Sequence, residues 1–350
     1  MPTSDHPAPA QLPSTVRTAA ARWGGAQVQV TPLTGDASPR TYYRARRETP
    51  APGDAATVIL ADHHGPIDPL NFSFLETTAL FSAAGIPVPA VLHCEPEAGL
   101  LLMEDLGDGL LQSVVTSHGS ADARDVQDLY NKAVDIIFNI QDQGTPQIDP
   151  VTQAGRLRLD AELLRRELDL FFQHLVIDLR GQDPSLGKRQ RATAAFDRLC
   201  SRLDAEPQVL CHRDYHSRNL LVGADGRLTV IDHQDARRGP DTYDLASLLD
   251  DPYVERTEDW RDRMVDRYLA TRGQDEDPAA FRSRLDAMAA QRLLKAAGTY
   301  AAQQVRYGHA FYLDYLPGAL SRARACLSRH AEHADLLAAL APLVPELALP

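Results

Sequence analysis

The chain has 350 residues, which is more than one hydrophobic core usually organises, so two lobes are the default expectation. A composition of 44% hydrophobic and 24% charged residues is typical of a globular protein rather than a disordered one. The net charge of −12 argues against a general affinity for nucleic acid or for an anionic membrane surface, because both partners require a basic surface.

Cysteine usage and hydropathy indicate the compartment. The four cysteines, at positions 94, 200, 211 and 326, lie far apart, which indicates reduced thiols rather than a disulfide framework or a zinc site. No stretch approaches the roughly 18 consecutive apolar residues of a membrane span, and the N-terminus lacks the basic-then-apolar order of a signal peptide. These features predict a cytoplasmic protein.

The first part of the chain predicts a leader and then a small β-rich lobe. Residues 1–27 begin with a Pro- and Ala-rich run without periodicity and are expected to be a partly disordered leader. Residues 28–106 are expected to form the first lobe, with one helix over 72–84 that stops at Gly85. Short strands are expected at 28–30, 42–45, 57–60, 88–92 and 99–103.

Residues 107–350 predict a larger and mostly helical lobe. One hairpin interrupts it, formed by Leu220–Val222 and Leu228–Ile231 around the turn Asp225-Gly226. The predicted fold class is therefore α+β, with a small β-rich N-terminal lobe that carries one helix and a helical C-terminal lobe. Helices are expected near 122–142, 156–180, 188–203, 258–272, 279–306 and 319–342.

Polar residues that suit phosphoryl transfer bracket this hairpin. Asn219 follows Asp214 by five positions, which is the spacing of the kinase catalytic loop H-R-D-x-x-x-x-N, and Asp232 follows the second strand. Phosphoryl transfer from ATP requires a carboxylate that orients and deprotonates the acceptor hydroxyl, and oxygen ligands that hold Mg²⁺ on the phosphates. The sequence therefore predicts Asp214 as the catalytic base and Asn219 and Asp232 as magnesium ligands.

Each piece of this pattern also has a plainer interpretation. A lone H-x-D is usually a loop histidine beside a solvated aspartate, and an aspartate at a strand end is commonly a turn former. The order of the elements favours the catalytic interpretation, because the loop, the hairpin, Asp232 and the segment 239–246 follow one another as in a kinase.

The same residues carry a resemblance to a known family. The runs HRDYHSRNLLV and IDHQDARRGPDTYDLASLL resemble the signature of the aminoglycoside-phosphotransferase-like kinases, which are two-lobed relatives of the protein kinases. Within that family the chain is most similar to the anomeric N-acetylmuramate/N-acetylglucosamine kinases of bacterial cell-wall recycling. This likeness extends from about residue 28 to about residue 318 and includes PLTGDASPRTYYR, GLLLMEDLGD and RLLKAAGTYAAQQVRYGHAFYLDYLP.

The resemblance implies a two-lobed protein-kinase-like fold, ATP as co-substrate, Mg²⁺ as cofactor and an amino sugar as acceptor. The expected reaction transfers the γ-phosphate to the anomeric hydroxyl of N-acetylmuramate or N-acetylglucosamine and gives the α-1-phosphate. Asp244 resembles the aspartate that braces the catalytic loop, although an N-cap for the helix after it is an equal interpretation. His212 is expected to orient the loop. His216 and Arg218 are candidates for contact with substrate or phosphate, or else exposed loop positions.

The resemblance also implies a nucleotide site in the first lobe. The loop with Gly35, Ser38 and Arg40 would cover the phosphates with its backbone amides. The segment around Glu104 and Leu106 resembles the hinge whose backbone pairs with adenine, and its plainer interpretation is an edge strand that leads into a loop.

One departure from the protein kinases concerns the lysine of the third strand, which holds the α- and β-phosphates in those enzymes. Thr57–Leu60 contains no lysine, and no lysine precedes residue 132. Arg40 or Arg44 is expected to serve the phosphates through its planar fork, unless magnesium and backbone amides do so alone. Glu76, at the helical position of the usual lysine partner, then has no defined role.

Three other functions remain open from the sequence. An antibiotic-modifying kinase would share every catalytic residue and differ in its acceptor pocket. A kinase for another small alcohol or an unmodified hexose would also share them. A nucleotide-binding pseudokinase that acts as a regulator is supported by the missing lysine and opposed by the intact Asp214, Asn219 and Asp232.

Overall fold

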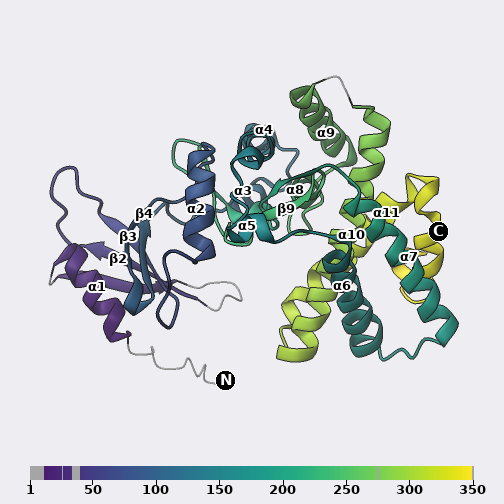
Figure 1. Ribbon diagram of the computed structural model, residues 1–350, viewed down its shortest axis with the longest axis horizontal. Coiled ribbons are helices and arrows are strands. Elements are labelled where there is room, and N and C mark those ends of the chain that lie inside the picture. The colour runs from purple at the N-terminus through teal and green to yellow at the C-terminus, as the bar shows by residue number, and fades with distance from the viewer. Residues whose placement is uncertain (1–11, 26, 34–39, 274–275, 349–350) are drawn as a thin grey trace. The chain divides into compact units, whose positions relative to one another are not determined.

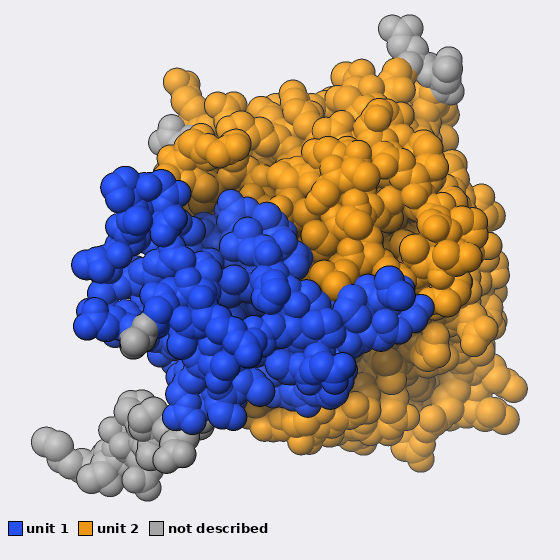
Figure 2. All heavy atoms as spheres, turned by 60° about the vertical axis from the view of Figure 1, so that its left-hand side comes forward, with its two compact units in different colours: residues 1–72, 89–107 blue, residues 73–88, 108–350 orange. Residues whose placement is uncertain are grey.

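A computed structural model describes residues 12–25, 27–33, 40–273 and 276–348. The chain folds into two compact units, one formed by residues 1–72 and 89–107 and the other by residues 73–88 and 108–350. Figure 1 traces the elements, and Figure 2 shows the two units in different colours. Among the helices of the described part, none is both long and apolar enough to cross a membrane.

The first unit is built on a five-stranded antiparallel sheet with the order β1-β2-β3-β5-β4. The register pairs Tyr43 of the second strand with Leu60 of the third, and Leu60 with Leu102 of the fifth. All five strands lie close to their predicted positions. Their bounds are β1 (Val28–Leu33), β2 (Thr41–Arg47), β3 (Thr57–Asp62), β4 (Val91–Glu95) and β5 (Leu100–Glu104).

Helix α1 (Ser14–Gly24) packs against this sheet (Figure 1). Its small apolar residues Val16, Ala19 and Ala20 recur at helical spacing and are buried in one cluster with side chains of the strands. Arg47 of β2 stacks over the ring of Trp23 at 4.3 Å. The interpretation of residues 1–27 as a leader therefore missed a helix that completes the core of the first unit.

The second unit is mostly helical and is organised around α10 (Pro278–Tyr307), whose N-cap Asp277 accepts a hydrogen bond from the backbone of Ala279. Helices α6, α8 and α11 pack against it. Gly298 permits a close approach to α6, because a Cβ at this position would lie 2.5 Å from the Cα of Phe171. The bounds of the helices are α2 (Ser73–Ala83), α3 (Leu111–His118), α4 (Arg124–Asn139), α5 (Gln153–Arg156), α6 (Ala161–Phe171), α7 (Leu186–Asp204), α8 (Tyr243–Leu249), α9 (Glu258–Arg272), α11 (Leu316–Ser328) and α12 (Ala334–Leu340).

These helices confirm most of the predicted ones, and π-helical turns over Ile140–Gly144 and Phe172–Leu179 continue α4 and α6. The single helix predicted over 319–342 is wrong. The chain turns between α11 and α12, where Arg329 and His330 both reach Asp286, at 2.7 and 2.9 Å.

Two small antiparallel sheets interrupt the helices and hold the candidate catalytic segments. The hairpin of β7 (Leu220–Val222) and β8 (Leu228–Val230) is confirmed. A second pair, β6 (Gln208–Cys211) with β9 (Arg237–Pro240), was not predicted. Residues 212–219 connect β6 to β7, and residues 231–236 connect β8 to β9, so the strand pairs fix both ends of each segment. The observed architecture confirms the predicted α+β fold class.

Candidate active site

The predicted catalytic loop, residues 212–219 after β6, is held by a buried carboxylate and is called the catalytic loop below. Asp244, at the start of α8, accepts hydrogen bonds from the backbone nitrogens of His212 at 2.6 Å and Arg213 at 3.0 Å. Burial raises the pKa of Asp244 in spite of these donors. Arg213 has a φ of 84°, so the two hydrogen bonds stabilise a backbone conformation that an L-residue rarely adopts.

His212 connects this loop to the end of β8. The histidine is buried, and its Nε2 lies 3.0 Å from the carbonyl oxygen of Ile231. Its Nδ1 accepts a hydrogen bond of 3.3 Å from the backbone nitrogen of Asp214. His212 thus contacts backbone on both sides, which is the geometry of an orienting residue.

A third brace lies at the far end of the loop and was missed in the sequence. Asp251 is fully buried and accepts hydrogen bonds from the backbone nitrogen of Ser217 at 2.9 Å and from its hydroxyl at 2.5 Å. Asp251 also accepts from the backbone of Tyr253 at 2.8 Å. One carboxylate therefore couples the catalytic loop to the segment after α8.

Asn219 and Asp232 lie at the same end of the β7–β8 hairpin. The backbone nitrogen of Ile231 donates to the carbonyl of Asn219 at 3.0 Å, which places Asp232 next to Asn219 in the ladder. The Nδ2 of Asn219 donates to the carbonyl of Asp214 at 2.8 Å, so the carboxamide oxygen is the end that remains for a cation. Asp232 has a φ of 60° and an exposed side chain, whose Oδ1 accepts from Gln234 at 3.0 Å.

Helix α2 holds the residue that follows Asp232. His233 is fully buried, with its ring 4.9 Å from that of Phe74 and 5.6 Å from that of Phe81, measured between centroids. Its Nε2 lies 2.7 Å from the hydroxyl of Thr78. These α2 residues fix the backbone next to Asp232.

Glu76 of α2, which the sequence left without a role, supports the same turn. Its carboxylate accepts a hydrogen bond of 3.0 Å from the backbone nitrogen of Gln153, in the first turn of α5. The side chain of Gln153 in turn donates to the carbonyl of Gln234 at 2.9 Å. Glu76 is thus a helix-capping residue that stabilises the chain around Asp232.

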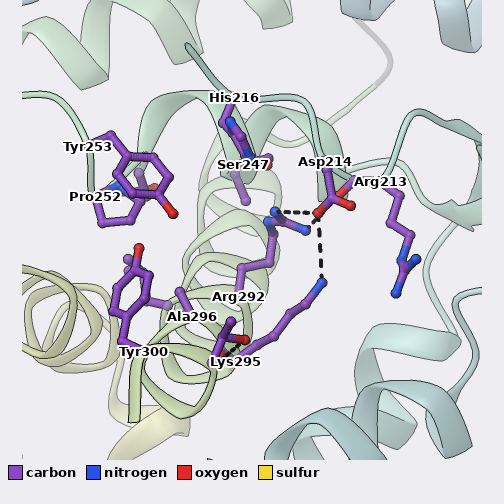
Figure 3. A pocket seen from close by; sticks show the side chains of 14 residues that line it. Arg213, Asp214, His216, Ser247, Pro252, Tyr253, Arg292, Lys295, Ala296 and Tyr300 are labelled. Atoms are coloured by element: carbon purple, nitrogen blue, oxygen red, sulfur yellow. Dashed lines mark hydrogen bonds and ion pairs between the residues drawn. The ribbon is translucent and has the colours of Figure 1, made fainter. Parts of the chain in front are cut away.

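The carboxylate of Asp214 faces two cations of α10 (Figure 3). Lys295 and Arg292 each place a nitrogen 3.9 Å from Oδ1 of Asp214, and Arg292 also donates to the carbonyl of Arg213 at 2.9 Å. Although burial alone would raise the pKa of Asp214, the positive charges of Lys295, Arg292 and Arg213 outweigh it and hold this pKa well below its ordinary value. The side chain is still 33% exposed, so a substrate can reach it.

A cavity of about 310 Å³ opens beside Asp214, within the second unit. The catalytic loop, α8, the segment after α8 and α10 all contribute to its wall. Figure 3 shows Asp214, His216 and Lys295 around one part of this cavity and Tyr253 and Tyr300 around another. Its size and its mixture of apolar and polar groups suit a small organic molecule.

The two candidate contact residues of the catalytic loop differ in position. His216 lines the cavity and is half-buried, and burial lowers the pKa of its ring, which favours the neutral form. Arg218 stacks over the ring of Tyr253 at 4.7 Å and does not line the cavity. Of the two candidates, His216 is thus the one that lines the cavity.

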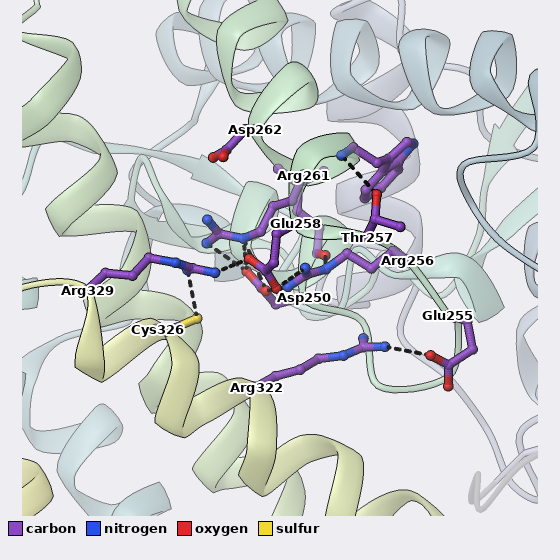
Figure 4. A network of polar contacts seen from close by, with 12 residues as sticks. Asp250, Glu255, Arg256, Thr257, Glu258, Arg261, Asp262, Arg322, Cys326 and Arg329 are labelled. Atoms are coloured by element: carbon purple, nitrogen blue, oxygen red, sulfur yellow. Dashed lines mark hydrogen bonds and ion pairs between the residues drawn. The ribbon is translucent and has the colours of Figure 1, made fainter. Parts of the chain in front are cut away.

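A buried ionic network supports the cavity wall on the side of Asp250 (Figure 4). Asp250 accepts hydrogen bonds from Arg256 at 2.5 Å and from Arg261 at 3.0 Å, and Arg261 continues to Asp286 at 2.7 Å. Arg322 of α11 donates to the carbonyls of Asp251 and Val254. Charged groups thus fix the segment that presents Tyr253 to the cavity.

The predicted nucleotide contacts fall in the first unit. Gly35 and Ser38 lie outside the described residues. Arg44 makes a bidentate pair with Asp105, with its Nε 2.8 Å and its second nitrogen 3.1 Å from the two carboxylate oxygens. This pair ties β2 to the segment after β5, so Arg44 is already engaged in a structural contact.

The remaining predicted contacts lie at the ends of strands. Arg40 directly precedes β2, Glu104 ends β5, and Leu106 follows two residues later. The backbone nitrogen of Glu104 donates to the carbonyl of Ala90 at 2.9 Å, and its carboxylate accepts from the backbone of Ala90 at 3.3 Å. These contacts order the segment that was expected to face adenine.

The sequence did not assign any role to the cavity residues of α10. Arg292, Lys295, Thr299 and Tyr300 recur at helical spacing, so one face of α10 lines the cavity. This spacing was visible in the run RLLKAAGTY. The partner Glu167, 3.1 Å from Lys295, comes from α6 and carried no such signal.

A two-unit α+β fold, with a braced catalytic loop whose aspartate faces a small-molecule cavity, defines a phosphotransferase of the protein-kinase-like class. Residues 29–282 match the model of the Phosphotransferase enzyme family, and the chain belongs to this family.

Relatives are similar along almost the whole chain. An N-acetylmuramate/N-acetylglucosamine kinase of Neisseria meningitidis is 31% identical over 315 residues, which cover 88% of this chain and 89% of the relative. A protein of the same description from Pseudomonas aeruginosa is 31% identical over 332 residues, which cover 92% and 90%.

Solved structures agree on the fold. A spectinomycin phosphotransferase in complex with ADP and spectinomycin has a TM-score of 0.60 at 13% identity and covers 92% of this chain and 99% of its own. A choline/ethanolamine kinase family protein from Mesorhizobium loti has a TM-score of 0.59 at 16% identity, with 93% and 99% covered.

Proposed function

We propose that the protein is an ATP-dependent sugar kinase that phosphorylates the anomeric C1 hydroxyl of N-acetylmuramate, N-acetylglucosamine or both, and forms the α-1-phosphate. The observation that carries this proposal is the similarity, at about 31% identity over about nine-tenths of the chain, to two kinases described by these two sugars. The cavity beside Asp214 supports it, because its volume of about 310 Å³ is adequate for a small acceptor.

In this reaction Asp214 acts on the acceptor. Its carboxylate orients the sugar hydroxyl and takes its proton as the hydroxyl oxygen bonds to the γ-phosphorus and the bond to the β–γ bridging oxygen breaks, which releases ADP. The low pKa of Asp214 keeps the carboxylate ionised, so its main contribution is orientation with the proton accepted late. Asp244 and His212 position this carboxylate through the backbone of the loop.

The residues of the hairpin fit the Mg²⁺ ion that this chemistry requires. Asn219 offers a carboxamide oxygen and Asp232 an exposed carboxylate at the same end of the hairpin, and Mg²⁺ binds such oxygen ligands together with substrate phosphates and water. When bound, the ion would neutralise charge on the transferring phosphoryl group. Asn219 and Asp232 are accordingly proposed as its protein ligands.

The nucleotide would be held by the first unit. We assign backbone amides around Gly35 and Ser38, together with Arg40, to the phosphates, and the backbone between Glu104 and Leu106 to adenine. Arg44 was an alternative phosphate ligand from the sequence. Its bidentate pair with Asp105 instead favours a role in ordering this hinge segment.

A product-resolved assay tests the proposal. The purified protein is incubated with ATP, Mg²⁺ and single sugars, and ³¹P–¹H couplings of the product identify the phosphorylated carbon. The proposal expects a phosphate on C1 of N-acetylmuramate or N-acetylglucosamine, and loss of turnover in Asp214→Ala and in Asp232→Ala with an unchanged circular dichroism spectrum. A phosphate on another carbon, or turnover only with aminoglycosides or choline, would reject it.

A further inference from the structure

Two buried hydroxyl groups on the cavity wall lack a well-formed hydrogen bond among the described residues, although that of Tyr300 interacts with the neighbouring Tyr253. They are the Oγ of Ser247, on α8, and the Oη of Tyr300, on α10. Both residues line the cavity beside Asp214, and they are only 5% and 2% exposed. Buried polar groups in proteins are almost always satisfied, and these two hydroxyls, unlike others without a partner, belong to residues that line a cavity in which a ligand can supply the missing bond.

Contacts within the protein leave hydrogen-bonding capacity of both hydroxyls unused. A serine inside a helix commonly donates to a backbone carbonyl one turn earlier, but Ser247 makes no such bond. A tyrosine whose hydroxyl serves no purpose could be replaced by phenylalanine at no cost, whereas a buried hydroxyl without a partner is unfavourable. A ligand that enters the cavity would supply the missing hydrogen bonds.

The surroundings of the two hydroxyls suit a sugar. The side chains of Leu293 and Ala296 line the cavity beside the aromatic rings of Tyr253 and Tyr300, whose centroids are 6.3 Å apart. Apolar and aromatic surface of this kind packs against the C–H faces of a pyranose, and a few hydroxyls fix its orientation. Burial and the neighbouring Tyr253 raise the pKa of Tyr300, so its hydroxyl remains a neutral donor and acceptor.

Tyr300 and Asp214 lie at different parts of the cavity (Figure 3). An acceptor with its reacting hydroxyl at Asp214 would therefore present a different substituent to Tyr300. We propose that Ser247 and Tyr300 determine acceptor specificity by hydrogen-bonding neutral polar substituents of the sugar, hydroxyl or acetamido groups, other than the hydroxyl that is phosphorylated. This inference rests on the proposed function for the identity of the acceptor.

Isosteric substitutions test the inference. Tyr300→Phe and Ser247→Ala each remove one hydroxyl and leave the apolar surface in place. Steady-state kinetics are measured with N-acetylglucosamine, N-acetylmuramate and glucose as single acceptors. A site built to bond a polar group loses specificity when that bond is removed, so kcat/KM for the preferred acceptor should fall by about 10-fold or more, with an unchanged KM for ATP. The ratio of kcat/KM for the preferred acceptor to kcat/KM for the other acceptors should move towards 1 as well.

Tyr130→Phe is the matched control. Tyr130 is also fully buried with a hydroxyl that has no partner in the described structure, but it packs edge-on against Trp260 at 4.8 Å and does not line the cavity. Removal of the Tyr130 hydroxyl should leave kcat/KM for every acceptor unchanged. Thermal unfolding of all variants separates loss of a sugar contact from loss of fold.

The outcomes separate the two proposals. If the wild-type protein phosphorylates a sugar and the folded Tyr300→Phe and Ser247→Ala variants do so with unchanged kcat/KM and acceptor preference, the inference is overturned and the proposed function stands. The same holds if Tyr130→Phe loses as much as they do. If the wild-type protein phosphorylates no member of the panel, the proposed function fails first and the inference fails with it.

Discussion

Lys295 holds its ammonium nitrogen 3.9 Å from a carboxylate oxygen of Asp214 and 3.1 Å from one of Glu167. It is one of three lysines in the chain, and it connects α10 and α6 to the catalytic loop. Because a cation at this distance favours the charged form of a carboxylate, Lys295 helps to keep Asp214 ionised inside a partly closed site.

Lys295→Met should move the pH dependence of catalysis through the charge of Asp214. Without the ammonium group, burial acts with less opposition, so the pKa of Asp214 should rise towards its ordinary value. The acidic limb of the pH profile of kcat/KM should therefore move to higher pH, whereas kcat at pH 7 should fall by less than about 10-fold, because the carboxylate is ionised there in both proteins. Steady-state kinetics from pH 7 down to the lowest pH at which both proteins stay folded measure both effects.

Lys188→Met is the control, since Lys188 lies in the first turn of α7 and does not line the cavity. Its pH profile should match that of the wild-type protein. A Lys295→Met variant with reduced kcat but an unmoved acidic limb would contradict the electrostatic role and leave only a packing role.

Asp244→Asn should slow turnover by disturbing the loop. Asp244 accepts two backbone hydrogen bonds, and an asparagine keeps only one oxygen for the nitrogens of His212 and Arg213. Arg213, at a φ of 84°, would lose support for its conformation, and Asp214 would shift. A small misplacement of a catalytic group costs about 100-fold in rate, so kcat should fall by about this factor.

The control for this substitution is Asp225→Asn, at the exposed turn of the β7–β8 hairpin, which should turn over like the wild-type protein. The crucial comparison is the KM for ATP, which should change little in Asp244→Asn. A variant with normal kcat would show that the loop does not depend on this brace.

The sequence predicted those parts of the site whose residues lie close together along the chain. Asp214, Asn219 and Asp232 lie within one loop and one hairpin, so their spacing predicted that they come together. The observed hydrogen bonds of Asn219 and Ile231 agree with this arrangement. The phosphate loop around Gly35 stays a prediction, because it lies outside the described residues.

The cavity beside Asp214 had a local signal only within α10, and its other walls had none. Ser247, Lys295 and Tyr300 come from α8 and α10, and only the packing of these helices brings them to one wall. Helix α1 was missed because its buried face consists of two alanines and one valine, which give only a weak periodic hydrophobic pattern. The β6–β9 pair was missed because β9 reads RRGP and resembles a polar turn.

Asp250→Asn should destabilise the second unit. Asp250 is 2% exposed and pairs with both Arg256 and Arg261, so the substitution leaves two buried guanidinium groups short of a counter-charge. Removing one partner of a buried ion pair costs about 3–5 kcal/mol, and the free energy of unfolding from urea titrations should fall by about this amount.

The exposed pair of Arg282 and Asp262 provides the comparison. Asp262→Asn should lower the free energy of unfolding by at most about 1 kcal/mol, because solvent screens an exposed pair. Equal losses in the two variants would contradict the assigned importance of the buried network in Figure 4.

Glu206→Gln should change the pH dependence of stability in a defined direction. Burial raises the pKa of Glu206 to about 7, although Thr242 donates a hydrogen bond to it and Arg284 lies 3.3 Å away. A carboxyl group with a raised pKa in the folded state contributes stability that is present below its ordinary pKa, and this contribution is lost as the pH rises through about 7.

Glutamine does not titrate, so the variant avoids this loss. The free energy of unfolding of Glu206→Gln should therefore increase, relative to that of the wild-type protein, by about 2–3 kcal/mol between pH 5 and pH 8. Asp250→Asn serves as the reference, because the pKa of Asp250 is lowered to about 2 by Arg261 and Arg256 against the effect of burial. That carboxylate stays ionised across this range, so the difference for Asp250→Asn should be constant. Urea titrations at pH 5, 6.5 and 8 measure the difference in free energy of unfolding between each variant and the wild-type protein. If this difference for Glu206→Gln stays constant or decreases with pH, Glu206 is charged in the folded protein.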